Sequence, residues 1–394
     1  MSRWRGFLGC SLAWAIGSTL SGTPARAADI GPGEGPLSVE VHAFVSQGFI
    51  LTTGNDYINA DTTNGSFQFT EVGINFTKTL FTDKLRVGAQ IFGQDLGPAG
   101  SFKAQMDWFY LDYHWQDWLG FRAGRLKIPY GFFNEFADID SARVFVLLPQ
   151  SIYPLQERNF LFAQNGAELY GFARSRSAGA LEYRLYGGTV YIDPALVIPP
   201  GSTLQFQFNV PYILGGRLVW ETPIDGLRVG ATVNGIHLDS TAFIPPTTKL
   251  SLPNDSFAYL ASADYVWRDL TATAEFGRGH TFQGSSNLML QGTLSQTSEG
   301  GYGMLAYRAA RWFQPGAYYS VYFPDVHDMH SRDKRQHDAA VTLRFDINDH
   351  WLVKLEGHYM QGTAALTSPL TATAPAATAD RYWSAFFLKT TGYF

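Results

Sequence analysis

The segment Arg381–Phe394, RYWSAFFLKTTGYF, decides the fold. Its side chains alternate between two faces, as they do in a β-strand. One face carries no charge, whereas the other carries Arg381 and Lys389. This asymmetry is typical of a strand with lipid on one side and a wet lumen on the other. Because an open sheet edge in hydrocarbon leaves backbone groups unpaired, we expect this strand to pair with the first one and close a barrel.

The end of the chain carries a second signal. The last residue is aromatic, Phe394, and apolar residues occupy alternate positions before it. This pattern resembles the C-terminal signal of bacterial outer-membrane barrels. The resemblance implies a protein of the outer membrane of a Gram-negative bacterium, with the lipids of that membrane as partners.

The N-terminal residues predict a secretory signal peptide over 1–27. Two arginines precede the apolar run Gly6–Leu20, and the triplet Ala25–Ala27 fits the small-x-small cleavage rule. A lipoprotein signal ending at Cys10 is the alternative, which the continuation of the apolar run beyond Cys10 disfavours. Since Cys10 is the single cysteine, the cleaved chain would hold no disulfide and no cysteine-ligated metal.

The composition separates this chain from soluble domains and from helical membrane proteins. Charged residues are 16% of the chain, below the roughly 25% of soluble domains, while aromatic residues reach 15%. No run of about 18 apolar residues could span a bilayer as a helix. The net charge of −5 falls to −8 when the three arginines of the signal peptide are removed, which argues against a nucleic-acid partner.

Alternation along the rest of the chain predicts a transmembrane antiparallel β-barrel in one domain, 28–394, with about 16 strands of roughly ten residues. Short turns alternate with longer loops, and aromatic residues cluster at strand ends. An aromatic belt at the lipid interface explains these clusters better than the alternative, a soluble β-sandwich or propeller. The residues predicted to face lipid include Val229, Val341, Leu343 and Val353.

One long interruption, 127–164, is the segment predicted to carry function. It mixes aromatic residues, prolines and both charge signs, and its apolar content argues against disorder. A barrel of about 16 strands leaves an aqueous channel unless something narrows it. We expect this segment to fold into the lumen, pack apolar residues on the wall and present charges at a constriction. An extracellular lid or a latch between subunits is the alternative.

The candidate pore-lining and constriction residues are charged side chains of this segment and of inward-facing strand positions. They are Arg86, Arg122, Lys127, Glu135, Asp138, Asp140, Arg143, Glu157, Arg158, Arg184, Arg228, Arg344 and Lys354. Rings of like charge in a narrow pore set ion preference. For each residue the alternative is that it only solvates the lumen and pairs across strands. The inward carboxylates that oppose an anion preference are Glu40, Glu182, Glu275, Asp338 and Glu356.

The segment Arg122–Gly131, RAGRLKIPYG, resembles the Gly-Arg-x-Lys-x-Pro-x-Gly stretch of phosphate-selective porin O/P-like proteins. The similarity extends through Asn134 to about Gly171. It implies a homotrimeric porin of 16 strands with an inward loop. Phosphate-selecting members carry arginine ladders and clustered lysines. This sequence has no lysine cluster, so the resemblance does not extend to phosphate specificity.

These observations predict a passive outer-membrane diffusion channel for small hydrophilic solutes, including anions or carboxylates. No cofactor is expected. The sequence contains no Gly-x-Ser-x-Gly elbow, Walker loop or His-Glu-x-x-His motif, which disfavours an enzyme. A phospholipase-like hydrolase of the barrel wall or a surface ligand-binding protein is the alternative. The loop 325–337 spaces His and Asp as a divalent-cation site would, with solvated loop polarity as the alternative.

Overall fold

The computed structural model describes residues 28–30, 39–80, 83–97, 102–155, 158, 162–192, 205–244, 248–284, 294–366 and 378–394. The predicted signal peptide, 1–27, and Glu157 lie outside these residues. Within the described ranges, no helix is long and apolar enough to cross a membrane.

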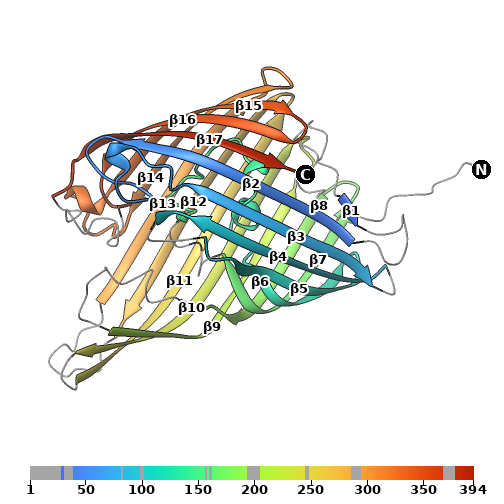
Figure 1. Cartoon of the computed structure of the whole chain (residues 1–394). Helices are drawn as coiled ribbons and strands as arrows, with labels where there is room; N and C mark the ends of the chain where they lie inside the picture. Colours follow the sequence, from blue (N-terminus) through green and yellow to red (C-terminus); the bar gives the residue numbers. More distant parts are fainter. Residues whose placement is uncertain are drawn as a thin grey trace, which may run out of the picture.

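Sixteen strands form one antiparallel barrel, β2 to β17, in which each strand pairs with the next along the chain (Figure 1). A short strand, β1 (Ala28–Ile30), pairs with the start of β2. The barrel strands are β2 (Val39–Thr52), β3 (Thr70–Leu80), β4 (Leu85–Asp95), β5 (Gln105–Gln116), β6 (Leu119–Lys127), β7 (Ala163–Ser175), β8 (Gly179–Thr189), β9 (Gln205–Glu221), β10 (Leu227–Ile244), β11 (Thr248–Trp267), β12 (Leu270–Gln283), β13 (Leu294–Tyr307), β14 (Phe313–Phe323), β15 (Gln336–Asn348), β16 (Trp351–Gly362) and β17 (Tyr382–Tyr393).

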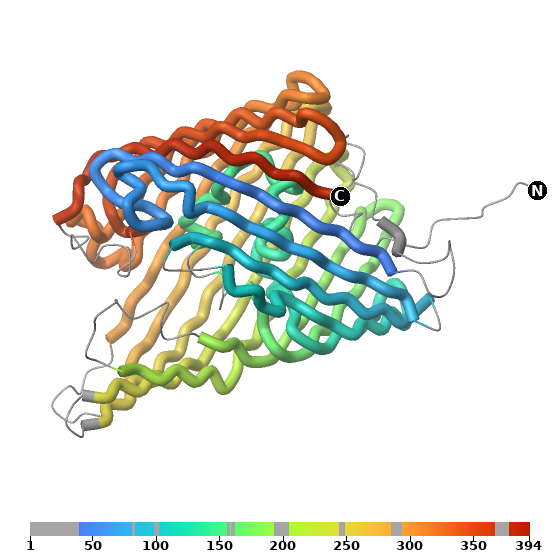
Figure 2. The backbone as a smooth tube through the Cα atoms, in the orientation of Figure 1, coloured from blue at the N-terminus to red at the C-terminus, as the bar shows by residue number. Residues whose placement is uncertain are grey.

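The last strand closes the barrel against the first, which confirms the predicted closed barrel. Tyr393 of β17 pairs with Phe44 of β2. The amide of Phe394 donates to the carbonyl oxygen of Ala43 at 3.0 Å, and the amide of Ala43 donates to Phe394 at 3.2 Å. In Figure 2 the red final strand runs beside the blue first strand. Closure gives each barrel strand two hydrogen-bonded neighbours, so the sheet has no open edge.

Side chains alternate between an exposed outer face and a sheltered inner face. On β17, Leu388 is exposed on the outside, whereas Lys389 is fully buried on the inside. On β15, Val341 is 59% exposed and Arg344 is 5% exposed. An apolar outer face and a polar inner face are what a barrel in lipid requires.

Tryptophans gather at the end of the barrel where the short turns lie. An aromatic ring at one height is typical of the level of lipid headgroups, where the indole ring has one apolar and one wet side. The exposed tryptophans beside these turns are Trp115, Trp118, Trp220, Trp267, Trp312 and Trp351.

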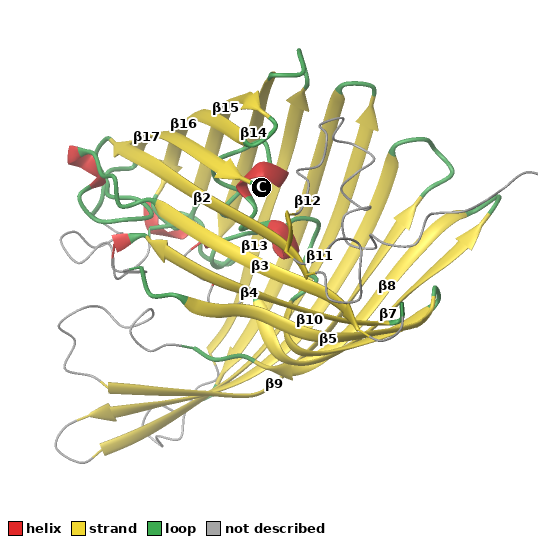
Figure 3. Ribbon diagram, turned by 45° about the vertical axis from the view of Figure 1, so that its right-hand side comes forward, coloured by secondary structure: helices red, strands yellow, loops and turns green. Residues whose placement is uncertain are grey.

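Three neighbouring strands are much longer than the ten residues expected from the sequence. β9, β10 and β11 have 17, 18 and 20 residues and project beyond the other strands (Figure 3). The outer faces of their projecting halves are polar, with Gln207 exposed on β9 and Asp255 exposed on β11. The expected strand length is therefore wrong for this wall, because the strands continue past the apolar band.

The long connection between β6 and β7, 128–162, lies inside the barrel. It contains two single-turn 3₁₀ helices, Asn134–Phe136 and Asp140–Ala142. Apolar side chains of the loop pack on the inner wall in two places. Phe145, Leu148 and Ile152 join a cluster with Tyr302 and Tyr318, and Val146 and Leu147 join another with residues of β2, β16 and β17.

Candidate functional site

Two glycines with positive φ lie near the start of the loop, Gly124 within β6 and Gly131 in the loop itself. Gly124 has a φ of 138° and Gly131 a φ of 58°, both in the region that favours glycine. A Cβ on Gly124 would lie 2.3 Å from the carbonyl oxygen of Phe109, and one on Gly131 would lie 2.2 Å from the hydroxyl oxygen of Tyr153. The segment that resembles the O/P-like stretch thus specifies the backbone path at the loop entrance.

Four charges, three of them buried and the fourth, Lys127, partly buried, tie both ends of the loop to β5. Lys127 Nζ lies 3.0 Å from a carboxylate oxygen of Asp107 and also bonds Asp138. Arg158 lies 3.0 Å from the other oxygen of Asp107 and bonds Asp138 as well. The Arg158 guanidinium also stacks over Phe92, 3.9 Å from the ring centre. Two cations and two anions balance, which buried charges require.

Asp140 is the contact between the middle of the loop and strands β16 and β17. Lys354 Nζ donates to the Asp140 carboxylate at 2.9 Å, to its carbonyl oxygen at 2.7 Å and to the Arg143 carbonyl oxygen at 2.8 Å. Thr391 donates to the second carboxylate oxygen at 2.7 Å, and Lys389 Nζ lies 3.5 Å from the first. The side chains of Asp140 and both lysines are 0% exposed.

Wall side chains also bind the backbone of the loop directly. Glu356 accepts hydrogen bonds from the amides of Val146 at 2.7 Å and Leu147 at 2.8 Å. Arg344 donates to the carbonyl oxygen of Ser141 at 2.8 Å. Hydrogen bonds to charged groups are the stronger kind, so these contacts fix the loop backbone as firmly as its side chains.

Glu275 of β12 holds the first part of the loop. It accepts hydrogen bonds from the amide of Phe132 at 3.0 Å, from the Ser262 hydroxyl at 2.5 Å and from the Tyr302 hydroxyl at 2.6 Å. The Tyr153 hydroxyl donates to it too and accepts from the Phe132 amide at 3.1 Å. One carboxylate therefore holds both the start of the loop, at Phe132, and the later residue Tyr153 in place.

Glu135 lies between two arginines of the opposite wall. It pairs with Arg184 of β8 and lies 2.9 Å from Arg217 of β9. Burial alone would raise the pKa of Glu135, but the two arginines outweigh burial and lower the pKa to about 2. The carboxylate therefore stays charged, and the loop stays paired with this wall, at any pH well above that value.

The predicted pore-lining residues that the structure describes all have partners. Lys127, Glu135, Asp138, Asp140, Arg143, Arg158, Arg344 and Lys354 make the loop contacts above. Arg86 lies 3.4 Å from Glu40, Arg122 lies 3.2 Å from Asp112 and 3.3 Å from Glu168, Arg184 lies 2.9 Å from Glu182, and Arg228 lies 2.8 Å from Asp264. This differs from the expected constriction of presented charges, because a charge near a low-dielectric wall is costly unless paired. A role of these residues in ion preference stays a prediction.

Solved structures with the same arrangement of strands include three bacterial outer-membrane proteins. An anion-selective porin from Comamonas acidovorans has a TM-score of 0.57 and 12% identity, over 91% of this chain and 99% of that one. The outer membrane channel DcaP of Acinetobacter baumannii has a TM-score of 0.56 and 12% identity, over 91% and 97%. OmpT of Vibrio cholerae has a TM-score of 0.55 and 11% identity, over 93% and 100%. This is the 16-stranded porin fold.

The porin fold rests on this structural similarity and on the closed barrel itself. Comparison with protein-family models gives no match, and comparison with curated protein sequences gives none either. Because only 11–12% of the residues are identical to those of these three proteins, the similarity covers the barrel and not the side chains inside it. The site must therefore be read from this chain's own residues.

Several charged residues of the loop site were not among the predicted pore-lining residues. They are Asp107, Asp112, Glu168, Arg217, Asp264 and Lys389. Alternation could have found them, since each occupies an inward position next to an outward apolar one. Arg217 precedes the exposed Leu218, and Lys389 follows the exposed Leu388.

The partly exposed residues of the loop include three aromatic side chains, beside Glu135, Ser141, Gln150 and Ser151. Tyr130, Phe133 and Phe136 are each partly exposed, and the Phe133 and Phe136 rings meet edge to face with centres 5.6 Å apart. We call these three residues the aromatic face of the loop. The charged side chains of the described part of the loop, by contrast, are paired with wall residues or with one another. Within this porin fold the described part of the loop thus offers aromatic side chains to whatever enters the lumen, while its charges are held in pairs.

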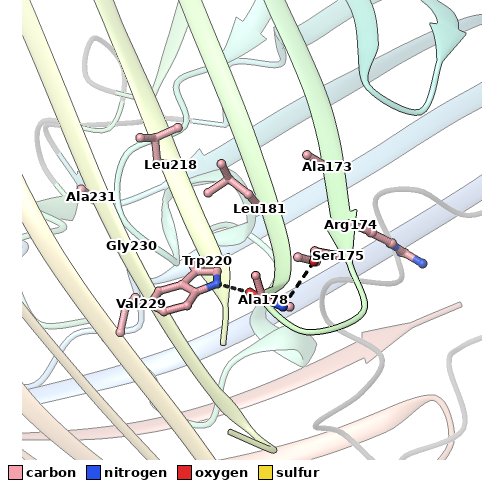
Figure 4. A pocket seen from close by; sticks show the side chains of 12 residues that line it. Ala173, Arg174, Ser175, Ala178, Leu181, Leu218, Trp220, Val229, Gly230 and Ala231 are labelled. Carbon is pink, nitrogen blue, oxygen red and sulfur yellow. Dashed lines mark hydrogen bonds between the residues drawn. The ribbon is translucent and has the colours of Figure 1, made fainter. Parts of the chain in front are cut away.

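A groove of about 610 Å³ on the outer face of the porin fold is a poor candidate for a solute site. Its lining includes Leu181, Leu218 and Trp220 (Figure 4). The Trp220 indole donates to the carbonyl oxygen of Ala178 at 2.7 Å, beside a short turn. The groove is apolar and lies on the face expected to meet lipid, so lipid tails would fill it.

In the His- and Asp-rich loop 325–337, His327 contacts Asp325, and His337 contacts Tyr319 of β14. His327 donates from its amide to Asp325 at 3.1 Å, and its ring nitrogen Nδ1 lies 3.0 Å from the same oxygen. Among the residues that the structure describes, no three His, Cys, Asp or Glu side chains lie together as a metal site would need. The contact between His327 and Asp325 fits the alternative of a solvated polar loop.

Acidification to about pH 4 should leave the loop contacts of Glu135, Asp138 and Asp140 in place. Burial raises the pKa values of Asp138 and Asp140, but the neighbouring cations outweigh it and lower both, as they lower that of Glu135 to about 2. A lowered folded-state pKa stabilises the fold above the unfolded value of about 4, and this stabilisation is lost only as the pH falls through the folded value. Single-channel conductance should therefore be the same at about pH 4 and pH 7. Larger current steps at about pH 4 would contradict this.

Proposed function

We propose that the protein is a passive diffusion channel for small hydrophilic solutes in the outer membrane of a Gram-negative bacterium. The observation that carries the proposal is a closed barrel of 16 strands with a long loop bound inside its lumen. A barrel of this strand number encloses an aqueous lumen. A loop inside the lumen narrows this channel without blocking it. The exposed apolar outer face and the tryptophan ring support the membrane location.

By charge, the proposed solutes are anions or carboxylates. Most of the Arg and Lys side chains in the lumen are, however, paired with carboxylates. Among the predicted pore-lining arginines, Arg86 and Arg228 have side chains 30% and 29% exposed. They are therefore the residues best placed to attract an anion. The anion-selective porin among the similar structures supports the same direction. Because their partners Glu40 and Asp264 lie close, the preference should be weak.

A homotrimer and kinship with the phosphate-selective porin O/P-like proteins are the finer parts of the proposal. The segment Arg122–Gly131 supports the kinship. It leads into the loop inside the lumen, as the resemblance to that family implies. The resemblance also supports the trimer, as does a structure of OmpT from Vibrio cholerae in trimer form.

Deleting residues 141–150, joined by two glycines, should raise single-channel conductance about twofold or more, because the deletion removes a large part of the loop from the lumen. Conductance is measured on the purified, folded protein in planar bilayers. The matched control is deletion of residues 326–330, which lie in the exposed loop between β14 and β15. This control should keep the wild-type conductance.

Two results would contradict different parts of the proposal. Unchanged conductance after the deletion in the inner loop would sink the constriction but leave the channel. A folded wild-type barrel without current steps would sink the channel. That result would favour the alternative of a barrel-wall hydrolase or a surface ligand-binding protein.

A further inference from the structure

The projecting halves of β9, β10 and β11 have their polar and apolar faces reversed relative to the rest of the barrel. In the lower half of β9, the outward residues include Leu218 and Trp220, and in the projecting half they include Gln205 and Gln207. On β9 the phase changes at a register shift, where His237 pairs with Tyr212 but Asp239 pairs with Asn209. One extra residue in a strand moves all later side chains to the other face. On β10 and β11 the pairing is regular, and the residue types on each face change instead.

The inner face of the projecting halves is mainly apolar, with Ser240, Asn254 and Ser256 among its members. Phe206 and Phe208 stack with ring centres 6.0 Å apart and planes 8° from parallel. We call six partly exposed apolar residues of this face the inner strip. The inner strip consists of Phe206 and Phe208 of β9, Ile236 and Leu238 of β10, and Leu250 and Leu252 of β11.

The inner strip continues downward to the loop in the lumen. Phe208, Ile236 and Leu238 pack against a buried cluster that contains Ile128, and Tyr130 packs against the same cluster. Tyr130 and Phe133 also pack against the second cluster of the inner wall. Apolar side chains therefore follow one another from the projecting rim to the aromatic face of the loop.

Lipid does not explain this arrangement, because lipid would meet the outer face of the projecting halves. That face carries polar groups such as His237, whose Nδ1 lies 2.6 Å from Asp255. A polar outer face of this kind is suited to water. Apolar surface that faces the mouth of a water-filled barrel is unusual unless something binds it. Because the charges deeper in the lumen are paired with one another, apolar contact is the main interaction that this region can make with a solute.

We propose that the inner strip binds the apolar part of a permeating solute and passes it to the aromatic face of the loop. The solute class is a small amphiphile, with a hydrophilic head and an aromatic or branched aliphatic body. Contact with an apolar wall replaces water around that body, whereas the head remains in the aqueous lumen. This inference rests on the proposed channel function and narrows its solutes.

Uptake of phenylalanine and glutamine tests the inference, because both are zwitterions and differ mainly in the apolar body. The full-length protein is reconstituted in liposomes, and swelling rates are compared at low solute concentration. The wild type should admit phenylalanine faster than glutamine by about threefold or more. Phe206→Ser combined with Phe208→Ser should lower this ratio toward one. The matched control, Gln205→Ser combined with Gln207→Ser on the outward face of the same strand, should keep the wild-type ratio.

A second measurement uses the wild type alone and so does not depend on the folding of a variant. Phenylalanine added to one side of a planar bilayer should interrupt the channel current for resolvable times, and glutamine should not. A wild-type ratio near one, a wild-type ratio that the double phenylalanine variant retains, or the lack of interruptions would each overturn the inference while the channel stands. A folded barrel with neither swelling nor current would instead sink the proposed function itself.

Discussion

Replacing Asp140 with leucine should free the middle of the loop and raise single-channel conductance about twofold or more. The change leaves the fully buried Lys354 without its carboxylate partner, and removing one partner of a buried ion pair costs about 3–5 kcal/mol. Lys389 keeps Glu71 at 2.6 Å, so the barrel seam should survive while the loop is released. Conductance in planar bilayers and limited proteolysis of the segment 128–162 measure the two effects.

Two further variants serve as controls for Asp140→Leu. Asp140→Asn keeps an acceptor for Thr391 and removes the charge, so it should fall between the wild type and the leucine variant. Asp328→Leu changes an exposed aspartate and should alter neither conductance nor proteolysis. Wild-type behaviour of Asp140→Leu would show that this carboxylate does not hold the loop.

Replacing Val341 with arginine should destabilise the folded barrel by about 2–4 kcal/mol, the cost of a cation at the midplane of the lipid face. Val341 is 59% exposed in the middle of β15. Ile347→Arg places the same side chain on the same strand and face, beside the tryptophan ring, where the cost should be only about 0–1 kcal/mol. Unfolding in urea from lipid vesicles measures both free energies.

Equal losses for the two arginine variants would contradict the membrane depth inferred for β15. Thr342 is unsuitable as an inward control, although alternation predicts an open lumen position there. It is fully buried and donates to the carbonyl oxygen of Leu355 at 3.3 Å. An arginine at that position would displace the packed inner wall and would not simply add charge to the lumen.

The barrel could be predicted from the sequence because its signals are local. Alternation in Arg381–Phe394 identifies a strand with two unlike faces, and the same period recurs along the chain. The limits of the inner loop were predicted as 127–164 and observed as 128–162, because alternation stops where the chain leaves the wall. A period of two needs only neighbouring residues to be visible.

The site could be predicted only in part, because its contacts join residues far apart in sequence. Glu356 and Val146 are separated by 210 positions, and nothing local marks the carboxylate as an acceptor for loop amides. An inward charge that lines a pore and one that holds a loop look alike in sequence. The reversed faces of β9 were hidden for another reason, since a single extra residue near Val210 changes the phase of the alternation.

The position of Asp140 links the final step of barrel assembly to the docking of the loop. Lys389 and Thr391 reach Asp140 only when β17 lies in its native register beside β2. A seam shifted by one residue would turn Lys389 toward lipid and leave both Asp140 and Glu71 without it. A barrel sealed in the wrong register would therefore lose contacts to its own inner loop, and the native register would be favoured from within the lumen.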